Sequence, residues 1–223
     1  WSGRDRFILS KGHACLTLYA ALADLGFFDV EELQHFAGKG SLLPGHPDTE
    51  IPGIEACSGS LGHGLGVGAG MALAGRIDRA PWRVFVVLGD GECNEGSVWE
   101  AAMFAGHQKL HNLIAIVDSN GLGATDFTDN YLTLEPLAER FRAFGWEVVE
   151  ADGHDLAALI AELTVARDHT MGKPCVLIAK TIKGKGVPFM ENSPQWHHRM
   201  PKGDEIMAAR AFLEAHISEL LVE

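Results

Sequence analysis

Short apolar runs alternate along the chain with stretches in which apolar residues recur with the period of an α-helix. Runs rich in valine, isoleucine and leucine lie at 83–88, 112–118 and 174–180, and a fourth, shorter run lies at 146–150. Continuous apolar runs of this length are typical of strands buried on both faces of a parallel sheet. The pattern therefore predicts an α/β fold in which a parallel sheet is flanked by helices on both faces.

Apolar positions of helical period predict helices over 134–144, 155–168 and about 204–222, with Asp155 as the N-cap of the second. We expect the last helix only to pack against the body. The segment 59–75 carries seven glycines with small residues between them, which predicts a closely packed helix after a tight loop. Such glycines are typical of tight internal packing or of close approach by a ligand or partner chain, and these explanations are compatible.

The length and composition limit the classes of protein that the chain can belong to. It has 223 residues, 47% of them apolar, which is enough for a single domain over 1–223. Its 18 basic and 30 acidic residues give a net charge of −12, which argues against binding nucleic acid or an anionic membrane. No apolar run is long enough to span a bilayer, and no signal peptide opens the chain.

These features predict a cytoplasmic enzyme. The four cysteines are widely spaced and form no CxxC pair, so we expect free thiols in a reducing compartment. The chain begins at Trp1 and not at methionine, and we therefore expect that an N-terminal extension of the natural protein is missing.

Two polar motifs follow predicted strands. Asp90 lies in a Gly-Asp-Gly-Glu sequence after one strand, and Asn120 lies thirty positions further on, after the next. In a parallel sheet, ligands bind beyond the carboxyl ends of the strands. Oxygens of Asp90, Asn120 and a backbone carbonyl near Leu122 could supply three ligands to Mg²⁺, or to Ca²⁺ or Mn²⁺ in its place. The Gly91 amide begins the next helix, where a diphosphate is favoured.

Each motif alone has a simpler explanation. Asp90 could cap the helix that follows it, and Asn120 could make an ordinary turn. The two motifs at this separation, each after a buried strand, favour the metal and diphosphate site over these explanations.

This pair resembles the thiamine diphosphate signature, in which a Gly-Asp-Gly sequence is followed at this spacing by an asparagine. Further segments narrow the resemblance to transketolases: they are RDRFILSKGH at 4–13, LPGHP at 43–47, GSLGHG at 59–64, GWEV at 145–148 and DGHD at 152–155. The chain ends in KGKG at 183–186 and WHH at 196–198, and it is most similar to the N-terminal, diphosphate-binding subunits of split transketolases.

The resemblance implies a thiamine-diphosphate-binding fold and a role for each matching position. The residues expected at the cofactor are His13, Gly59, Leu61, Gly91, Glu95, Asn120, Ile182 and His197, and those at the metal are Asp90, Asn120 and Leu122. Leu61 and Ile182 would pack on the thiazolium ring. Glu95 would lie at the interface between subunits and link to the catalytic glutamate of the neighbouring chain.

Three histidines are the expected catalytic residues. The resemblance implies that His46 reaches the hydroxyl groups of a donor sugar, while His13 and His197 also contact the diphosphate. Histidine suits both hydrogen bonding and proton transfer because it titrates near neutral pH. The expected reaction is transfer of a two-carbon ketol unit from a ketose, or its phosphate, to an aldehyde.

The resemblance also implies that this chain is only part of a catalyst. In the family, the glutamate that activates the cofactor's pyrimidine ring lies on a second α/β domain. We therefore expect a partner, the C-terminal transketolase subunit with the pyrimidine-binding domain, and an α₂β₂ assembly. Two alternatives remain open: a related thiamine-dependent synthase or 2-oxo acid dehydrogenase subunit, and a catalytically silent scaffold subunit.

Overall fold

A five-stranded parallel sheet forms the centre of the computed structural model, which describes residues 2–168 and 172–220. Its strands are β1 (Arg6–Leu9), β2 (Val84–Gly89), β3 (Leu113–Ser119), β4 (Glu147–Asp152) and β5 (Cys175–Lys180). They are hydrogen-bonded in the order β1-β2-β3-β5-β4, and every neighbouring pair is parallel. All carboxyl ends therefore lie on one edge of the sheet, where the predicted site residues follow their strands.

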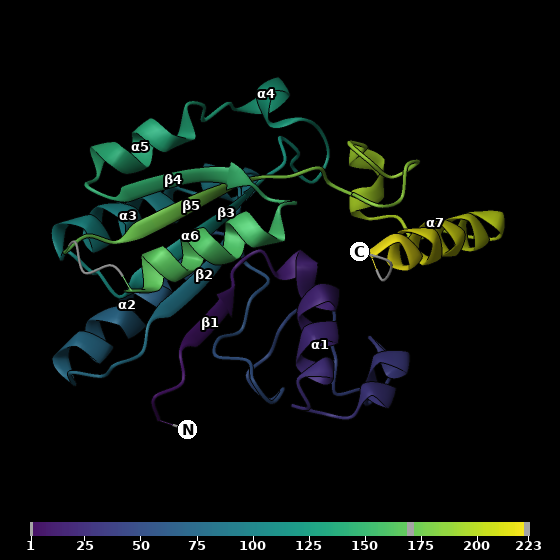
Figure 1. Cartoon of the computed structure of the whole chain (residues 1–223), viewed down its shortest axis with the longest axis horizontal. Helices are drawn as coiled ribbons and strands as arrows, with labels where there is room; N and C mark the ends of the chain where they lie inside the picture. The colour runs from purple at the N-terminus through teal and green to yellow at the C-terminus, as the bar shows by residue number, and fades with distance from the viewer. Residues whose placement is uncertain (1, 169–171, 221–223) are drawn as a thin grey trace.

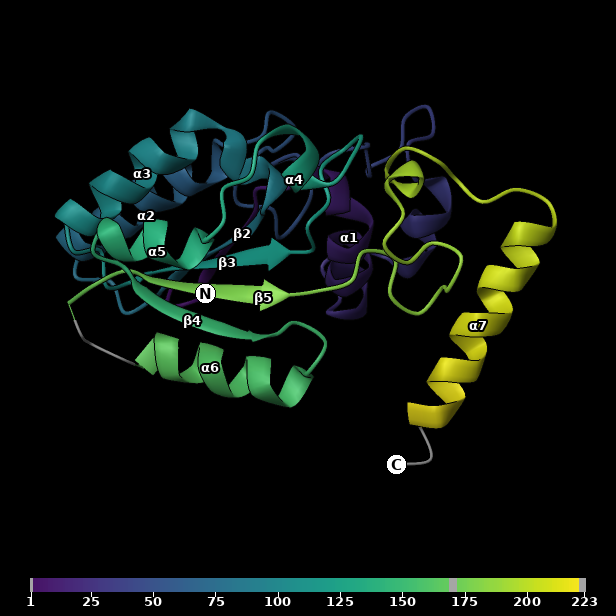
Figure 2. The ribbon, with the colours of Figure 1, turned by 90° about the horizontal axis from the view of Figure 1, so that it is seen from above.

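Helices cover both faces of this sheet (Figures 1 and 2). The helices are α1 (Cys15–Asp24), α2 (Gly64–Ile77), α3 (Gly96–His107), α4 (Thr128–Tyr131), α5 (Leu137–Ala143), α6 (Leu156–Asp168) and α7 (Asp204–Leu220). Short 3₁₀ helices lie at Gly12–Ala14, Val30–His35, Gly91–Asn94 and Pro194–His197. The main core lies between the sheet and α2, α3 and α5, and α6 covers the opposite face over β4 and β5. The expected α/β fold is confirmed.

The glycines of α2 are in part a consequence of packing. Gly68 is buried against β2, and a Cβ built on it would lie 2.5 Å from a methyl carbon of Val86. Gly66 and Gly70 have no atom of the described residues within 4 Å of such a Cβ, so this packing does not explain them. The tight-packing explanation therefore holds for part of the segment only.

The four predicted strands are present, each within two residues of the expected ends. Strand β1 was not expected, because it has four residues, starts with an arginine and lies at the sheet edge. The helix expected over 134–144 is shorter, since α5 begins after Pro136, which is its extended N-cap. Asp155 caps α6 as expected, and its carboxylate accepts a hydrogen bond from the Ala158 amide at 2.9 Å.

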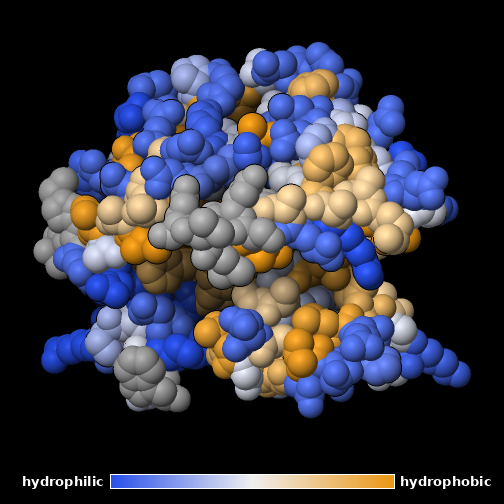
Figure 3. Space-filling model, turned by 45° about the vertical axis from the view of Figure 1, so that its right-hand side comes forward, coloured by the Kyte–Doolittle hydropathy of each residue, from blue (hydrophilic) through white to orange (hydrophobic). Residues whose placement is uncertain are grey.

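Helix α7 confirms the expected C-terminal helix up to Leu220, while positions 221 and 222 of the prediction lie outside the described residues. The helix stands away from the sheet and packs only in part, with Ala209 buried but Met207 and Ile217 exposed. Figure 3 shows apolar surface on both sides of a hollow on this face of the molecule. The expectation that α7 only packs therefore stays a prediction.

Two further expectations can be compared with the structure. All four cysteines are free, and three of them are buried. Among the helices of the described residues, none has both the length and the apolar character needed to cross a membrane.

Candidate functional site

A cavity of about 340 Å³ opens beyond the carboxyl ends of β1, β2 and β3. Eight of the predicted residues line it: they are His13, Leu61, Asp90, Gly91, Glu95, Asn120, Leu122 and His197. Residues as far apart in the sequence as His13 and His197 are in direct contact there. The parallel strand order brings these segments together, because each follows a strand that ends on the same edge.

Three predicted residues lie outside the lining of this cavity. His46 is adjacent to it, with its ring centroid 5.4 Å from that of His13. Gly59 lies against His46, and a Cβ built on Gly59 would be 3.5 Å from that ring. Ile182 lies in a separate depression with His154 and Lys185, so its predicted contact with the thiazolium ring stays a prediction.

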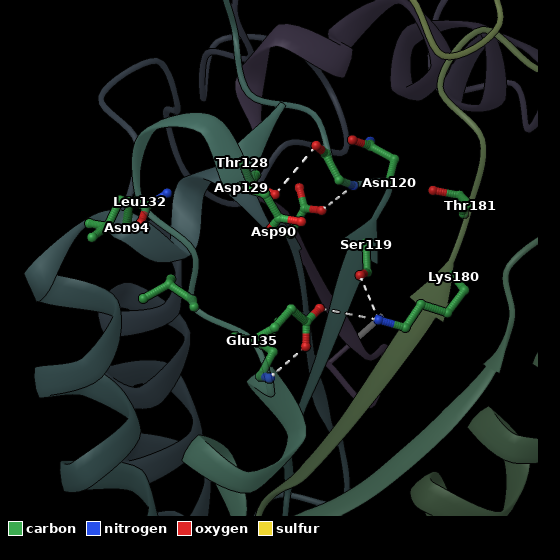
Figure 4. A pocket seen from close by; sticks show the side chains of 13 residues that line it. Asp90, Asn94, Ser119, Asn120, Thr128, Asp129, Leu132, Glu135, Lys180 and Thr181 are labelled. Carbon is green, nitrogen blue, oxygen red and sulfur yellow. Dashed lines mark hydrogen bonds and ion pairs between the residues drawn. The ribbon is translucent and has the colours of Figure 1, made fainter. Parts of the chain in front are cut away.

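Asp90 lies between the two loops that end β2 and β3. Its carboxylate accepts hydrogen bonds from the amide of Gly91 at 2.7 Å and from the amide of Gly121 at 2.6 Å. Figure 4 shows Asp90 beside Asn120, at the ends of neighbouring strands. Burial raises the pKa of Asp90, and the two backbone hydrogen bonds oppose this rise. The carboxylate therefore costs energy to bury and retains lone pairs that a cation could use.

The other two expected metal ligands, Asn120 and Leu122, line the same cavity. The amide oxygen of Asn120 accepts a hydrogen bond from the Leu122 amide at 2.9 Å. A Cβ built on Gly91 would lie 3.7 Å from the Leu122 carbonyl oxygen, so this oxygen lies close to Gly91. Nearby, the buried side-chain oxygen of Asn94 has no hydrogen-bond partner among the described residues.

This donor set fits Mg²⁺, which prefers oxygen ligands and keeps several positions for water or phosphate. Within the described part of the chain, no three His, Cys, Asp or Glu side chains gather as metal ligands. The proposed metal ligands would not form such a group, because only one of them is a carboxylate and the others are an amide oxygen and a backbone carbonyl. The hydrogen bonds of Asp90 and Asn120 also match the simpler cap and turn explanations, which are compatible with metal binding.

Lys11 and Asp118 form an ion pair beside the cavity that the sequence reasoning missed. The Thr181 hydroxyl also donates to Asp118. Burial works against ionisation of Asp118, but the charge of Lys11 and the hydrogen bonds together hold its pKa below the usual value. Lys11 lies inside the RDRFILSKGH segment and Asp118 ends a predicted strand, so both positions were visible, but their pairing across 107 positions was not.

Lys183 is a second positive charge in the cavity lining that was missed. Its pKa is lowered by burial and by the neighbouring charge of Lys11. Two lysines in the lining of one cavity suit a polyanionic group, for which charge-assisted hydrogen bonds are strong. The KGKG segment was the sequence signal for Lys183.

The histidines form a contact chain. The Nε2 atom of His197 lies 3.1 Å from Nδ1 of His13, and Nδ1 of His197 contacts the Lys183 ammonium. Burial, followed by the charge of Lys183, lowers the pKa of His197 to about 4. Burial and the neighbouring His46 lower the pKa of His13. His198 is next to His197 but does not line the cavity.

Lowering the pH from 7 to 5 is expected to destabilise the chain in part through His197. Its folded pKa of about 4 lies below the ordinary histidine value of 6.5, so between these values only the unfolded chain takes up the proton. Stability conferred by the neutral ring is therefore lost as the pH falls through this window. Since the ring is partly exposed and screened, we expect His197→Gln to reduce the fall in melting temperature by about 2 °C. Thermal unfolding at pH 7, 6 and 5 measures this, and equal falls would contradict it.

Glu92 is a buried carboxylate that the sequence reasoning did not single out. It accepts hydrogen bonds from the Ser10 hydroxyl, from the Gly62 amide at 2.8 Å and from the Gly89 amide at 3.2 Å. These bonds join the end of β1, the loop before α2 and the end of β2. Glu92 thereby holds the loop that presents Leu61 to the cavity.

Glu95 differs from Glu92 in being exposed. It is the N-cap residue of α3 at the rim of the cavity, and its carboxylate has no hydrogen-bond or ion-pair partner among the described residues. A free carboxylate at a cavity rim is available to a group outside the chain.

The family model for the thiamine diphosphate binding domain of transketolase matches residues 1–219. The chain is 43% identical over 217 residues to one of the subunits of the apulose-4-phosphate transketolase of Phocaeicola vulgatus, covering 97% of this chain and 77% of that protein. It is 42% identical over 215 residues to the 6-deoxy-6-sulfo-D-fructose transketolase subunit SqwG of a Clostridium species, covering 96% and 78%.

Solved structures of transketolases also resemble this chain. The transketolase of Campylobacter jejuni superposes with a TM-score of 0.88 at 33% identity, covering 96% of this chain and 35% of that one. A transketolase mutant of Pichia stipitis in complex with fructose 6-phosphate superposes with a TM-score of 0.89 at 35% identity, covering 96% and 33%. The chain thus spans about a third of the length of these solved proteins.

Proposed function

The chain belongs to the transketolase family, and on that premise we propose that it binds thiamine diphosphate with Mg²⁺ and, with a partner chain, transfers a two-carbon ketol unit from a ketose to an aldehyde. The observation that carries the proposal is the single cavity in which the oxygens of Asp90, Asn120 and Leu122 lie with the charges of Lys11 and Lys183. Oxygens suit the cation, and lysines suit the diphosphate.

Thiamine diphosphate, when bound, supplies an electron sink for breaking the carbon–carbon bond beside a ketose carbonyl. In this chain Asp90, Asn120 and the Leu122 carbonyl would hold Mg²⁺. Gly91 lies at the start of a 3₁₀ helix and lines the cavity, and its amide, which donates to Asp90 in this structure, would donate to a phosphate oxygen when the cofactor is bound.

The histidines would act on the substrate. With lowered pKa values, His13 and His197 are neutral near pH 7, so each ring can donate one hydrogen bond and accept another. Their contact allows a proton to pass between the two rings. His46, beside His13, extends this polar wall towards the hydroxyl groups of a sugar.

The proposed partner is a C-terminal transketolase subunit that carries the pyrimidine-binding domain and the activating glutamate. Two relatives are named as transketolase subunits, and this chain spans most of their length but only about a third of the solved transketolase chains. An α₂β₂ assembly is the simplest closed arrangement of two such chains. The four free cysteines support the proposed cytoplasmic location, where thiols stay reduced.

The proposed donor is a ketose with an anionic group at the end remote from the carbonyl. One relative is named for a sugar phosphate and another for a sulfonated sugar, and both groups are anions. The groups that hold this anion are expected on the partner chain.

Mixing the purified chain with its partner, thiamine diphosphate, Mg²⁺ and a panel of ketose phosphates tests the proposal. We expect aldehyde release from at least one donor, with transfer to an aldehyde acceptor. No release from any donor would contradict ketol transfer. Carbon dioxide release from pyruvate without ketose turnover would favour the synthase or dehydrogenase alternative, and absence of metal-dependent cofactor binding would favour a scaffold subunit.

A further inference from the structure

The DGHD turn at 152–155 has no place in the site described above. It joins β4 to α6 and lies against the end of β5, on the same edge of the sheet as the cavity. The Gly153 amide donates to the Lys180 carbonyl at 2.8 Å. A Cβ built on Gly153 would overlap the methyl group of Thr181, so the turn and the end of β5 are packed without free space.

His154 makes a hydrogen bond that is not part of any regular element. Its Nε2 atom accepts from the backbone amide of Ile182 at 2.8 Å. The backbone of His154 is held by its own turn, because the His154 amide donates to the Asp152 carboxylate at 2.8 Å. A ring nitrogen can accept only while it carries no proton. The side chain is exposed and lines a depression with Glu150 and Lys185, away from the cavity.

The segment that His154 holds is the one that enters the site. Directly before Ile182, the Thr181 hydroxyl donates to Asp118. Directly after it, Lys183 lines the cavity and contacts His197. The Ile182 amide is therefore the midpoint of a three-residue segment in which Lys183 lines the cavity and Thr181 holds Asp118 beside it (Figure 4 labels Thr181 in the neighbouring pocket).

We infer that His154 is a positioning residue, which clamps the Ile182 amide and thereby fixes Thr181 against Asp118 and Lys183 in the cofactor cavity. Ile182 follows β5, where the Thr181 amide still bonds to the Ser119 carbonyl but no neighbouring strand of the described residues continues to pair with the chain. The imidazole replaces the missing strand partner at that point. The link to cofactor binding rests on the proposed function, whereas the clamp itself does not.

The test compares His154→Phe with His154→Gln in the full chain assembled with its partner. Phenylalanine keeps the ring but has no acceptor, while the side-chain amide of glutamine can place an oxygen near the position of Nε2. Asp155→Ala is the matched control, because it removes the cap of α6 from the same turn without touching Ile182. Two readouts are measured: hydrogen exchange of the backbone segment 181–185 and the Kd for thiamine diphosphate with Mg²⁺.

We expect His154→Phe to speed exchange in 181–185 and to weaken the Kd, each by about 3-fold to 10-fold, the range that one hydrogen bond provides. His154→Gln should restore both values to within about 2-fold of the wild type. Equal exchange in the phenylalanine variant and the wild type would overturn the clamp, as would equal effects of His154→Phe and Asp155→Ala. A wild-type complex that binds no thiamine diphosphate would instead overturn the proposed function, and the exchange comparison would still test the clamp.

Discussion

Replacing Asp90 with asparagine is expected to weaken Mg²⁺-dependent binding of thiamine diphosphate by about 100-fold or more. Asp90 is the one carboxylate among the three proposed metal ligands, so the substitution removes the charge that attracts the cation. The amide of asparagine keeps an oxygen that can still accept from Gly91 or Gly121. Calorimetric titration of the chain and its partner with cofactor, at fixed Mg²⁺, measures the effect.

The same substitution should leave the melting temperature at pH 7 unchanged or slightly higher. Burial raises the pKa of Asp90, so the ionised carboxylate is less favourable in the folded chain than in the unfolded chain at neutral pH. Asp126→Asn is the matched control, since Asp126 is an exposed carboxylate of the loop that follows β3 and lines neither the cavity nor its neighbour. Equal cofactor binding by the Asp90 variant and the control would contradict the metal site.

The fold could be predicted from the sequence where local pattern decides structure. The apolar strands β2, β3, β4 and β5 are visible because buried parallel strands need continuous apolar side chains. Strand β1 is not, because Arg6–Leu9 is too short to show a pattern and pairs on one side only, with a strand that begins at position 84. The exposed apolar side of α7 also could not be predicted. The spacing of apolar residues shows that a helix has an apolar face, but not which surface that face contacts.

The candidate site could likewise be predicted only where the local sequence pattern carries a signal. Asp90 and Asn120 were identifiable because each follows a strand, and the parallel topology places strand ends together. The ion pair of Lys11 with Asp118 and the hydrogen bonds of Glu92 with Ser10 and Gly62 join distant segments whose spacing carries no signal of contact. His154 was seen only as part of a motif, because its role depends on the Ile182 amide, and a backbone group has no signature in sequence.

Replacing Glu95 with glutamine is expected to lower the turnover of the assembled enzyme by about 100-fold, the range typical of a lost proton-transfer partner. The carboxylate of Glu95 is exposed at the cavity rim and has no partner among the described residues, so removing its charge breaks no hydrogen bond or ion pair described within this chain. Its expected partner is the activating glutamate of the second chain, and two carboxyl groups can share a proton whereas a carboxyl and an amide cannot.

The effect should therefore appear in kcat and not in folding or in cofactor affinity. Glu100→Gln is the matched control, because Glu100 is an exposed glutamate of the same helix that does not line the cavity. Steady-state kinetics of the two assembled variants give kcat. The cofactor Kd and the melting temperature of each variant show whether binding or folding has changed as well. Wild-type turnover in the Glu95 variant would contradict a link between Glu95 and the activating glutamate of the partner chain. A cofactor affinity that fell as far as the turnover would contradict it too, because the loss would then lie in binding.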